Sequence, residues 1–587
     1  MVNQLNAEEH VPTRRLFNPT DEQRAILNHE GNCVIAAGPG SGKTTILSHK
    51  ITQVLEEARM YQGVAAISFT NKASNELASK IHKLCKDTKH SFFGTMDSFY
   101  ISNFIIPFGK RYFGVPTDPL IITKIPETNE TKREVAQIKA ISQAITSIIR
   151  RYEHVSLEEL SKQGIQPILK LQESHLSFLQ EKYQSGFLDL RLVSGIANLI
   201  FLSSAVCQRY IRSRYTHLMI DEFQDSGYEQ YQLFKRIAEA GVICWAVGDP
   251  NQFLYRFLKR DPIYLTSLFD HPDFTTFQMT VNHRSHPSIN YYSQKLLGYE
   301  HEPPKENRVF YHFVEGNEVD IGRWFNDNVE LIKQTFGVED NFEIGIVARK
   351  DITLELFAQG LNIPYKFYQK TPLDEDQTPT GRTLYHLLCM SFDNRQSVTA
   401  FVEDKFGTDS LRNLGFIRQL KTLIQDFKGL VKAYQEDEHQ DDIEKIEVLF
   451  REISEYLYPN VSSLDQTIHN LQEILSNPRN LDNFIPAKKD EIQLMNIHKS
   501  KGLEFDFVLH LDLYQTIIPS AGWVIDGKEE DLIDSLNLHY VAVTRAKKGI
   551  ILVSSSHRFQ QRTGKFIQSD VSEFIKAEQI ETWKYNG

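Results

Sequence analysis

Short apolar runs recur along the chain, and each is followed by a polar or glycine-bearing turn. Runs of this length are typical of buried parallel strands, and segments of helical periodicity lie between them. This alternation predicts an α/β protein with doubly wound parallel sheets. The runs fall into two groups, so we expect two sheets and two α/β domains. They cover residues 33–36, 64–69, 218–220 and 242–247, and then residues 344–347, 507–511 and 550–553.

Two long segments, residues 101–210 and 381–487, lack such strand runs and carry helical patterns. Each interrupts one of the α/β halves, so each is predicted to be a mainly helical inserted subdomain. The clearest helix lies within residues 130–152, where apolar side chains recur at helical spacing. These side chains are Val135, Ile138, Ile141, Ile145, Ile148 and Ile149.

Composition narrows the class of protein. The 65 basic and 76 acidic side chains leave a net charge of −11, so any phosphate binding needs a local groove rather than a basic surface. The five cysteines include no C-x-x-C pair, so we expect neither zinc nor an iron–sulfur cluster. The polar N-terminus is not a signal peptide, and no run of 18 apolar residues is present. We therefore expect a cytoplasmic protein without a membrane partner.

A glycine-rich segment follows the first apolar run and opens a helical pattern. This is the context of a P-loop, in which glycines let backbone N–H groups surround phosphates. Lys43 is expected to reach the β- and γ-phosphate oxygens, and the Thr44 hydroxyl to bind Mg²⁺. Ala37 stands where the strict pattern has its first glycine. The loop itself consists of Gly38, Pro39, Gly40, Ser41 and Gly42.

The apolar run at residues 218–220 ends in two carboxylates, Asp221 and Glu222. Ligands bind beyond the carboxyl ends of parallel strands, so both acids are expected to lie beside the P-loop. Asp221 is then expected to hold Mg²⁺ and Glu222 to polarise the attacking water. The two motifs together predict nucleoside triphosphate hydrolysis.

Further segments, in the same order along the chain, resemble the motifs of UvrD/Rep/PcrA-like superfamily 1A DNA helicases. Each motif alone is moderately specific, but their joint order covers most of the chain. The segments are NPTDEQ at 18–23, FTNKA at 69–73, GTMDSF at 94–99, DEFQD at 221–225, VGDPNQ at 247–252, NHRS at 282–285, IHKSKGLEF at 497–505 and VAVTRA at 541–546.

The resemblance implies two RecA-like P-loop NTPase domains with ATP and Mg²⁺ in the cleft between them. The first domain would span residues 1–100 and 211–278 around insertion 101–210, and the second residues 279–380 and 488–587 around a reduced insertion 381–487. The implied catalytic residues are Lys43, Asp221, Glu222, Gln252, Arg284 and Arg545, with the arginines supplied across the cleft. The implied ATP contacts are Gln23, Gly38, Pro39, Gly40, Ser41, Gly42, Lys43, Thr44, Thr45, His283 and Glu504, and Thr44 and Asp221 would bind the metal.

The resemblance also implies contacts to single-stranded DNA, which need aromatic platforms and polar groups for the backbone. Core packing remains an alternative for Tyr255 and Phe257, a structural role for His498 and a surface salt bridge for Arg349. The candidates are Phe69, Thr70, Asn71, Thr95, Tyr255, Phe257, Arg349 and His498.

Three of the departures from the family's pattern lie in motifs assigned to ATP or to DNA. Phe257 stands in an Arg-Phe-Leu setting where Gly-Trp-Arg is usual, and His283 replaces an adenine-stacking tyrosine. Asp97 stands where histidine is common, and a carboxylate repels phosphate.

Two functions are consistent with these features. The first is an ATP-driven 3′→5′ translocase or helicase acting on single-stranded DNA or 3′-tailed duplex. The second is an accessory ATPase that loads, senses for or regulates a separate nuclease, as in bacterial anti-phage complexes. A third function, an inactive DNA-binding scaffold, is disfavoured because the implied catalytic residues are all retained.

Overall fold

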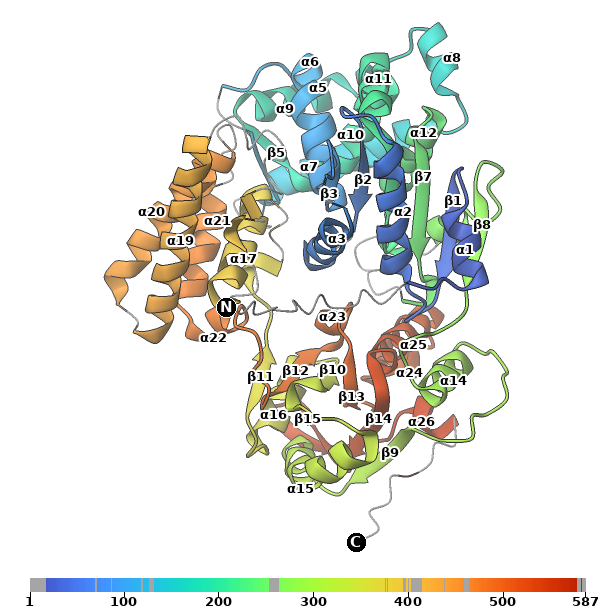
Figure 1. Cartoon of the computed structure of the whole chain (residues 1–587), viewed down its shortest axis with the longest axis vertical. Helices are drawn as coiled ribbons and strands as arrows, with labels where there is room; N and C mark the ends of the chain where they lie inside the picture. Colours follow the sequence, from blue (N-terminus) through green and yellow to red (C-terminus); the bar gives the residue numbers. More distant parts are fainter. Residues whose placement is uncertain are drawn as a thin grey trace, which may run out of the picture.

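The computed structural model describes residues 17–68, 71–85, 87–117, 120–125, 131–252, 263–374, 376, 378–393, 397–399, 401–402, 414–437, 439–458, 464–577 and 582. Figure 1 shows two α/β bodies, one above the other, with a group of helices along one side. The sheets of both bodies are entirely parallel within the described residues. The predicted α/β class with two doubly wound parallel sheets is confirmed.

The first sheet has the strand order β3-β2-β6-β7-β1-β8. Alternate residues of its central strands enter two different cores, as the period of two along a strand requires. Cys33 and Ile35 pack with α1 (Asp21–Leu27), α2 (Lys43–Glu57) and α3 (Asn71–Leu84), whereas Val34 faces α12 (Tyr228–Glu239) and the first insertion. The strands are β1 Cys33–Ala37, β2 Gly63–Ile67, β3 Phe92–Gly94, β6 Tyr215–Ile220, β7 Ile243–Gly248 and β8 Thr275–Met279.

The first insertion lies between β3 and β6 and is mainly helical. The predicted helix forms as α7 (Lys132–Arg151), and all six of its predicted apolar positions are buried. A two-stranded sheet of β4 (Ile121–Thr123) and β5 (Phe187–Asp189) accompanies the helices. The other helices are α4 Met96–Tyr100, η1 Ile101–Ile105, α5 Ile106–Phe108, α6 Lys110–Phe113, α8 Leu157–Lys162, η2 Pro167–Lys170, α9 Glu173–Gln184, η3 Leu190–Leu192, α10 Val193–Ser203 and α11 Ala205–Arg214.

No single helix in the described residues is long and apolar enough to cross a membrane. One pair, Leu190–Ser203 with Ala205–Arg214, reaches that length and composition only when its two arms are joined across a 103° bend. The α10 part of this pair belongs to the buried core of the first insertion.

The second sheet has the order β11-β12-β10-β13-β14-β9. Its core helices are α14 (Pro287–Leu296), α15 (Glu318–Phe336), α16 (Asp351–Gln359) and α25 (Glu529–Val543). The strands are β9 Val309–Val314, β10 Ile344–Ala348, β11 Tyr365–Tyr368, β12 Ile492–Asn496, β13 Phe505–His510 and β14 Ala546–Ser555, followed by the hairpin β15 His557–Gln560 and β16 Lys565–Gln568. Short helices complete this half: η7 Asn341–Glu343, η8 Pro372–Asp374, α23 Ile497–Ser500, α24 Ala521–Asp526 and α26 Glu573–Ala577. The short helix α13 Ile263–Thr266 precedes β8 and belongs to the first half, where Leu265 is part of the core.

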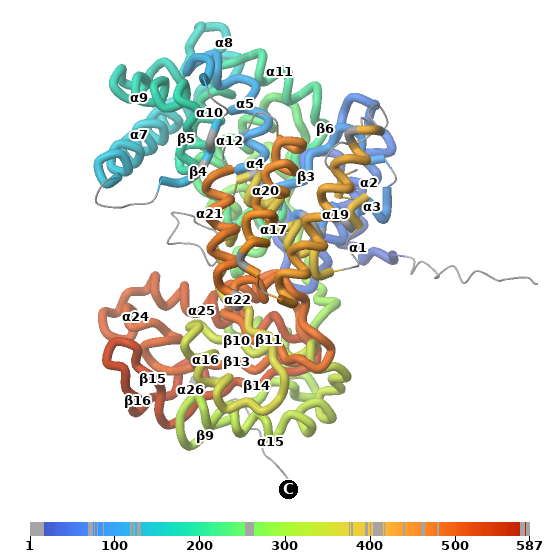
Figure 2. Tube along the Cα trace, turned by 90° about the vertical axis from the view of Figure 1, so that its left-hand side faces the viewer, coloured from blue at the N-terminus to red at the C-terminus, as the bar shows by residue number. Residues whose placement is uncertain are grey.

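The second insertion connects β11 to β12 and has its own apolar core. In Figure 2 its helices stand in front of the junction between the two α/β bodies. Its helices are α17 Pro379–Phe392, α19 Leu414–Glu436, α20 Gln440–Leu457, α21 Leu464–Leu475 and α22 Pro478–Asp482. Both α/β bodies therefore carry a helical insertion, as the sequence predicts.

Candidate functional site

The glycine-rich loop connects β1 to α2 at the carboxyl edge of the first sheet. Gly40 and Gly42 have φ values of 70° and 89°, a region that favours glycine. Lys43 starts α2, and its ammonium donates to the carbonyls of Ala37 at 3.0 Å and Gly38 at 3.3 Å. The lysine thus lies folded over the loop, at the N-terminus of a 15-residue helix that favours anions. Thr44 and Thr45 follow in the first turn of α2.

Gln23 contacts the loop from α1. Its side chain is buried, and its amide donates to the carbonyl of Ser41 at 3.0 Å. Gln23 and Thr20 also form a capping box at the start of α1. The position of Gln23 is therefore set by a local helix cap and by the P-loop itself.

Asp221 and Glu222 follow β6, two strands from β1 in the sheet. Both carboxylates lie near the ammonium of Lys43. Burial, together with the neighbouring Glu222, raises the pKa of Asp221. Burial acts in the same direction on the pKa of Glu222, but the ammonium groups of Lys501 and Lys43 outweigh it and hold this pKa below its usual range. Glu222 therefore stays ionised at neutral pH.

The backbone at Glu222 has a φ of 58°, which is uncommon for a residue with a side chain. Gln224 holds this turn from two sides. Its amide donates to the Glu222 carboxylate, and its carbonyl oxygen accepts the backbone N–H of Asp249 at 3.2 Å. A Cβ at Gly248 would collide with the Gln224 side chain, so the close approach requires glycine there.

The second domain faces this edge with two arginines. Arg545 is buried and donates to the Gln252 side-chain oxygen at 3.3 Å, across the domain boundary. Burial lowers the pKa of Arg545 to about 10, with nearby Arg284 acting in the same direction, so the guanidinium remains charged at neutral pH. Arg284 donates to Glu504 at 2.8 Å and to the carbonyl of Thr544 at 2.6 Å. The exposed His283 donates its backbone N–H to the Gly40 carbonyl at 2.9 Å.

A buried ion pair also joins the two domains. The Lys501 ammonium lies 2.6 Å from the Asp225 carboxylate, and the two side chains are 9% and 0% exposed. Lys501 donates in addition to the Gln252 carbonyl at 3.1 Å. Both residues lie in helicase-like motifs, but the sequence predicts no role for either of them. The only indication in the sequence is that each motif contains a charged residue at this position. A single sequence cannot show that two residues 276 positions apart form a pair.

Two of the residues predicted to contact single-stranded DNA lie close together at the carboxyl edge of the second sheet. Arg349 follows β10, and His498 lies in α23 directly after β12. Burial lowers the pKa of His498, and the neighbouring guanidinium of Arg349 acts in the same direction. Arg349 donates to the Ile517 carbonyl, and burial lowers its pKa despite the nearby Asp512.

Thr95 lies at the start of α4 and is only 3% exposed. Its hydroxyl accepts a hydrogen bond from Arg382 of α17, in the second insertion. Asp97, which departs from the family's pattern, is the first of the anionic neighbours that act on Arg382. Asn71 begins α3, but its side chain is not among those described, and Phe69, Thr70, Tyr255 and Phe257 lie outside the described residues.

The described residues contain no group of three or more His, Cys, Asp or Glu side chains that could hold a metal ion. The site is instead a P-loop, two strand-end carboxylates and arginines from a facing domain. This combination defines the class of P-loop NTPases with two α/β domains.

The comparisons with known families agree. Residues 19–271 match the UvrD/REP helicase N-terminal domain, and residues 375–557 match the UvrD-like helicase C-terminal domain. The chain therefore belongs to the UvrD/Rep-like helicases, and the resemblance stated from the motifs is confirmed.

Three relatives match along nearly the whole chain. Gabija protein GajB of Bacillus cereus (strain VD045) is 26% identical, over 91% of this chain and 95% of that protein. A probable DNA helicase II homolog of Mycoplasma genitalium is 24% identical, over 91% of this chain and 84% of its own length. ATP-dependent DNA helicase Rep of Buchnera aphidicola is 22% identical, over 92% and 95%.

Proposed function

We propose that this protein is an ATP-dependent 3′→5′ translocase and helicase on single-stranded DNA, driven by hydrolysis in the cleft between its two α/β domains. The observation that carries the proposal is the contact between Arg545 and Gln252. It brings a cation of the second domain to the first domain, near enough for Arg545 to lower the pKa of the Glu222 carboxylate. Nucleotide chemistry in the cleft is thereby linked to the relative position of the two domains.

Each group has a defined task in this proposal. Lys43 and the backbone of the P-loop bind the phosphates, and Glu222 orients and deprotonates the attacking water. Arg284 and Arg545 stabilise the charge that develops on the transferred phosphoryl group, a contribution of about 10³–10⁵ in rate for an arginine finger. Gln23 and His283 each donate a hydrogen bond to a carbonyl of the loop, and both are assigned to the adenine.

The donor set fits Mg²⁺, which prefers oxygen ligands and keeps substrate phosphates and water in its shell. Thr44 and Asp221 would hold the ion. Burial and repulsion by Glu222 raise the pKa of Asp221 in the absence of a metal ion. A cation bound to Asp221 would offset both effects and favour the ionised carboxylate. When bound, Mg²⁺ neutralises charge on the phosphates.

The Lys501–Asp225 pair suggests how the strand and the nucleotide are coupled. Lys501 and His498 belong to one short segment, so a strand that contacts His498 would move the ammonium that pairs with Asp225. Asp225 lies three residues from Glu222. Binding of DNA is therefore expected to change the hydrolytic site through this connection.

A second function is favoured by one comparison. The relative named Gabija protein GajB is 26% identical over 91% of this chain and 95% of its own length. We infer that this chain is also suited to act with a separate nuclease, as an ATPase that loads or regulates it. Such a partner would be expected to co-purify with the protein.

The test is ATP turnover with and without single-stranded DNA, compared between the wild type and Glu222→Gln. We expect strong stimulation by the strand in the wild type. In Glu222→Gln we expect ATP binding without hydrolysis, because the amide keeps the shape but cannot accept the proton. An oligonucleotide displacement assay on 3′- and 5′-tailed duplexes assigns polarity. Unstimulated turnover in folded, partner-free protein would refute the strand-driven motor and favour the nuclease-associated function.

A further inference from the structure

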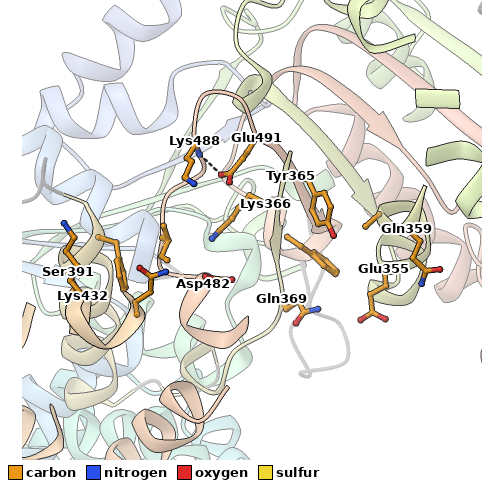
Figure 3. Close-up of a pocket in the computed structure, with 15 residues that line it drawn as sticks. Glu355, Gln359, Tyr365, Lys366, Gln369, Ser391, Lys432, Asp482, Lys488 and Glu491 are labelled. Carbon is orange, nitrogen blue, oxygen red and sulfur yellow. Dashed lines mark hydrogen bonds between the residues drawn. The ribbon is translucent and has the colours of Figure 1, made fainter. Parts of the chain in front are cut away.

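A cavity of about 790 Å³ lies where the second insertion joins the second α/β domain, far along the chain from the P-loop (Figure 3). The domain side is formed by α16, β11 and residues 482–491. The insertion side is formed by α17 and by Lys432 and Gln435 of α19. Cavities of roughly 300–1,000 Å³ are typical of small-molecule sites. The proposed helicase mechanism makes no use of this cavity.

Lys366 of β11 lines the cavity and is only 8% exposed. It forms no ion pair or hydrogen bond with any other residue that the structure describes. Its carboxylate neighbours are Asp482 and Glu491, and both act from beyond ion-pair distance. Glu491 instead accepts the backbone N–H of Lys488 at 2.8 Å. The ammonium is not among the buried atoms that lack a hydrogen-bond partner, so it is accessible from the cavity, where an anion can bind to it.

The cavity has two chemically different ends. Figure 3 shows Lys366 and Lys488 toward one end, and Glu355 and Gln359 of α16 toward the other. Asp482 lies on the lysine side, where it attracts Lys366 without pairing with it. Aromatic rings of Tyr365, Phe367 and Phe392 supply apolar wall.

We propose that this cavity binds a nucleoside monophosphate or a closely similar small phosphate ester. The phosphate would lie against Lys366 and Lys488, the planar base against the aromatic wall, and the donor groups of the base toward Glu355 and Gln359. Charge-assisted hydrogen bonds from lysine to phosphate are among the stronger polar contacts in proteins. The occupant would touch both the domain and the insertion, so its binding fixes the insertion against β11 and α16.

Equilibrium dialysis with radiolabelled AMP tests the proposal on the full chain. The P-loop is first saturated with a non-hydrolysable ATP analogue and Mg²⁺, so that only a second site is counted. We expect about one further AMP per chain, with a dissociation constant below about 1 mM. Lys366→Met removes the ammonium that faces the cavity and should weaken AMP binding at least about tenfold.

A matched pair of variants guards against misfolding. Lys488 and Lys489 are adjacent and exposed, but Lys488 lines the cavity whereas Lys489 pairs with Asp340 at 3.2 Å. Lys488→Ala should weaken AMP binding severalfold, and Lys489→Ala should leave it unchanged. Equal losses in these two variants, or no binding of AMP up to about 1 mM, would overturn the proposal. Inorganic phosphate that binds as tightly as AMP would overturn the assignment of a nucleoside.

Discussion

Gly40 is the point where the P-loop touches the segment that carries the first arginine. Its φ of 70° favours glycine, and its carbonyl accepts the backbone N–H of His283 at 2.9 Å. A Cβ at this position would meet the Asn282 side chain and would lie 2.7 Å from the Cβ of Arg284. We therefore predict that Gly40→Ala separates the P-loop from Arg284 while the rest of the protein stays folded.

The size of the effect follows from two contributions. An alanine at positive φ costs about 1–2 kcal/mol in conformational strain. For a domain of this size that corresponds to a fall of about 2–8 °C in Tm. The methyl group must also push residues 282–284 outward, and a displacement of about 1 Å in a catalytic group can lower kcat by about 100-fold. We expect the second effect to dominate the activity.

The assay is steady-state ATP turnover with saturating single-stranded DNA, together with a thermal melt of the same preparation. Gly164→Ala is the matched control, because Gly164 has a φ of 63° but nothing within 4 Å of an added Cβ. It should show a similar loss of stability and normal kcat. If Gly40→Ala turns over ATP within about threefold of the wild type, then contact with the arginine segment does not govern hydrolysis, and the reasoning from steric clash fails.

Two further predictions concern buried charges. Asp225→Asn leaves the Lys501 ammonium buried without its carboxylate. This should destabilise the contact between the two domains by about 3–5 kcal/mol. We expect a lower kcat/KM for ATP and a longer interdomain distance by fluorescence energy transfer, and unchanged values of both would contradict this. The Nε2 atom of His510 lies 3.0 Å from Nδ1 of His539, and burial lowers the pKa of His510 from 6.5 to about 3. The unfolded chain binds that proton and the folded chain does not, so the free energy of unfolding should fall by up to about 1.4 kcal/mol per pH unit below pH 6.5, as denaturant melts would measure. His510→Gln should reduce this slope, and an equal slope in that variant would show that other groups cause it.

The sequence predicts most of the strands that are central and apolar. It misses short and edge strands, and it also misses the interior strand β12, in which polar Gln493 and Asn496 interrupt the apolar run. All seven predicted runs are found in β1, β2, β6, β7, β10, β13 and β14. Among the strands that no run predicts, β3 has three residues, and β8 is an edge strand whose side chains are largely exposed. Half-exposed edge strands lack the continuous apolar run that identifies a buried parallel strand.

Some parts of the candidate site can be located from the sequence, and others depend on tertiary contacts. The P-loop and the strand-end carboxylates can be located from sequence because each is a contiguous motif whose local conformation follows from its own residues. Thr95 shows the limit of this approach. The motif predicts that Thr95 contacts single-stranded DNA. Whether its hydroxyl is accessible to DNA depends on Arg382, which lies 287 residues away and donates a hydrogen bond to it.

The sequence by itself therefore determined the α/β class, the two helical insertions and the residues of the phosphate-binding loop. These are written in local periodicity and in short motifs, which depend on neighbours within a few residues. Only the tertiary structure decided that Arg545 meets Gln252, that Lys501 pairs with Asp225 and that Lys366 faces a cavity with no ion-pair partner among the described residues. Burial and partnership of a charged side chain depend on segments hundreds of residues apart, and one sequence carries no pattern that pairs them.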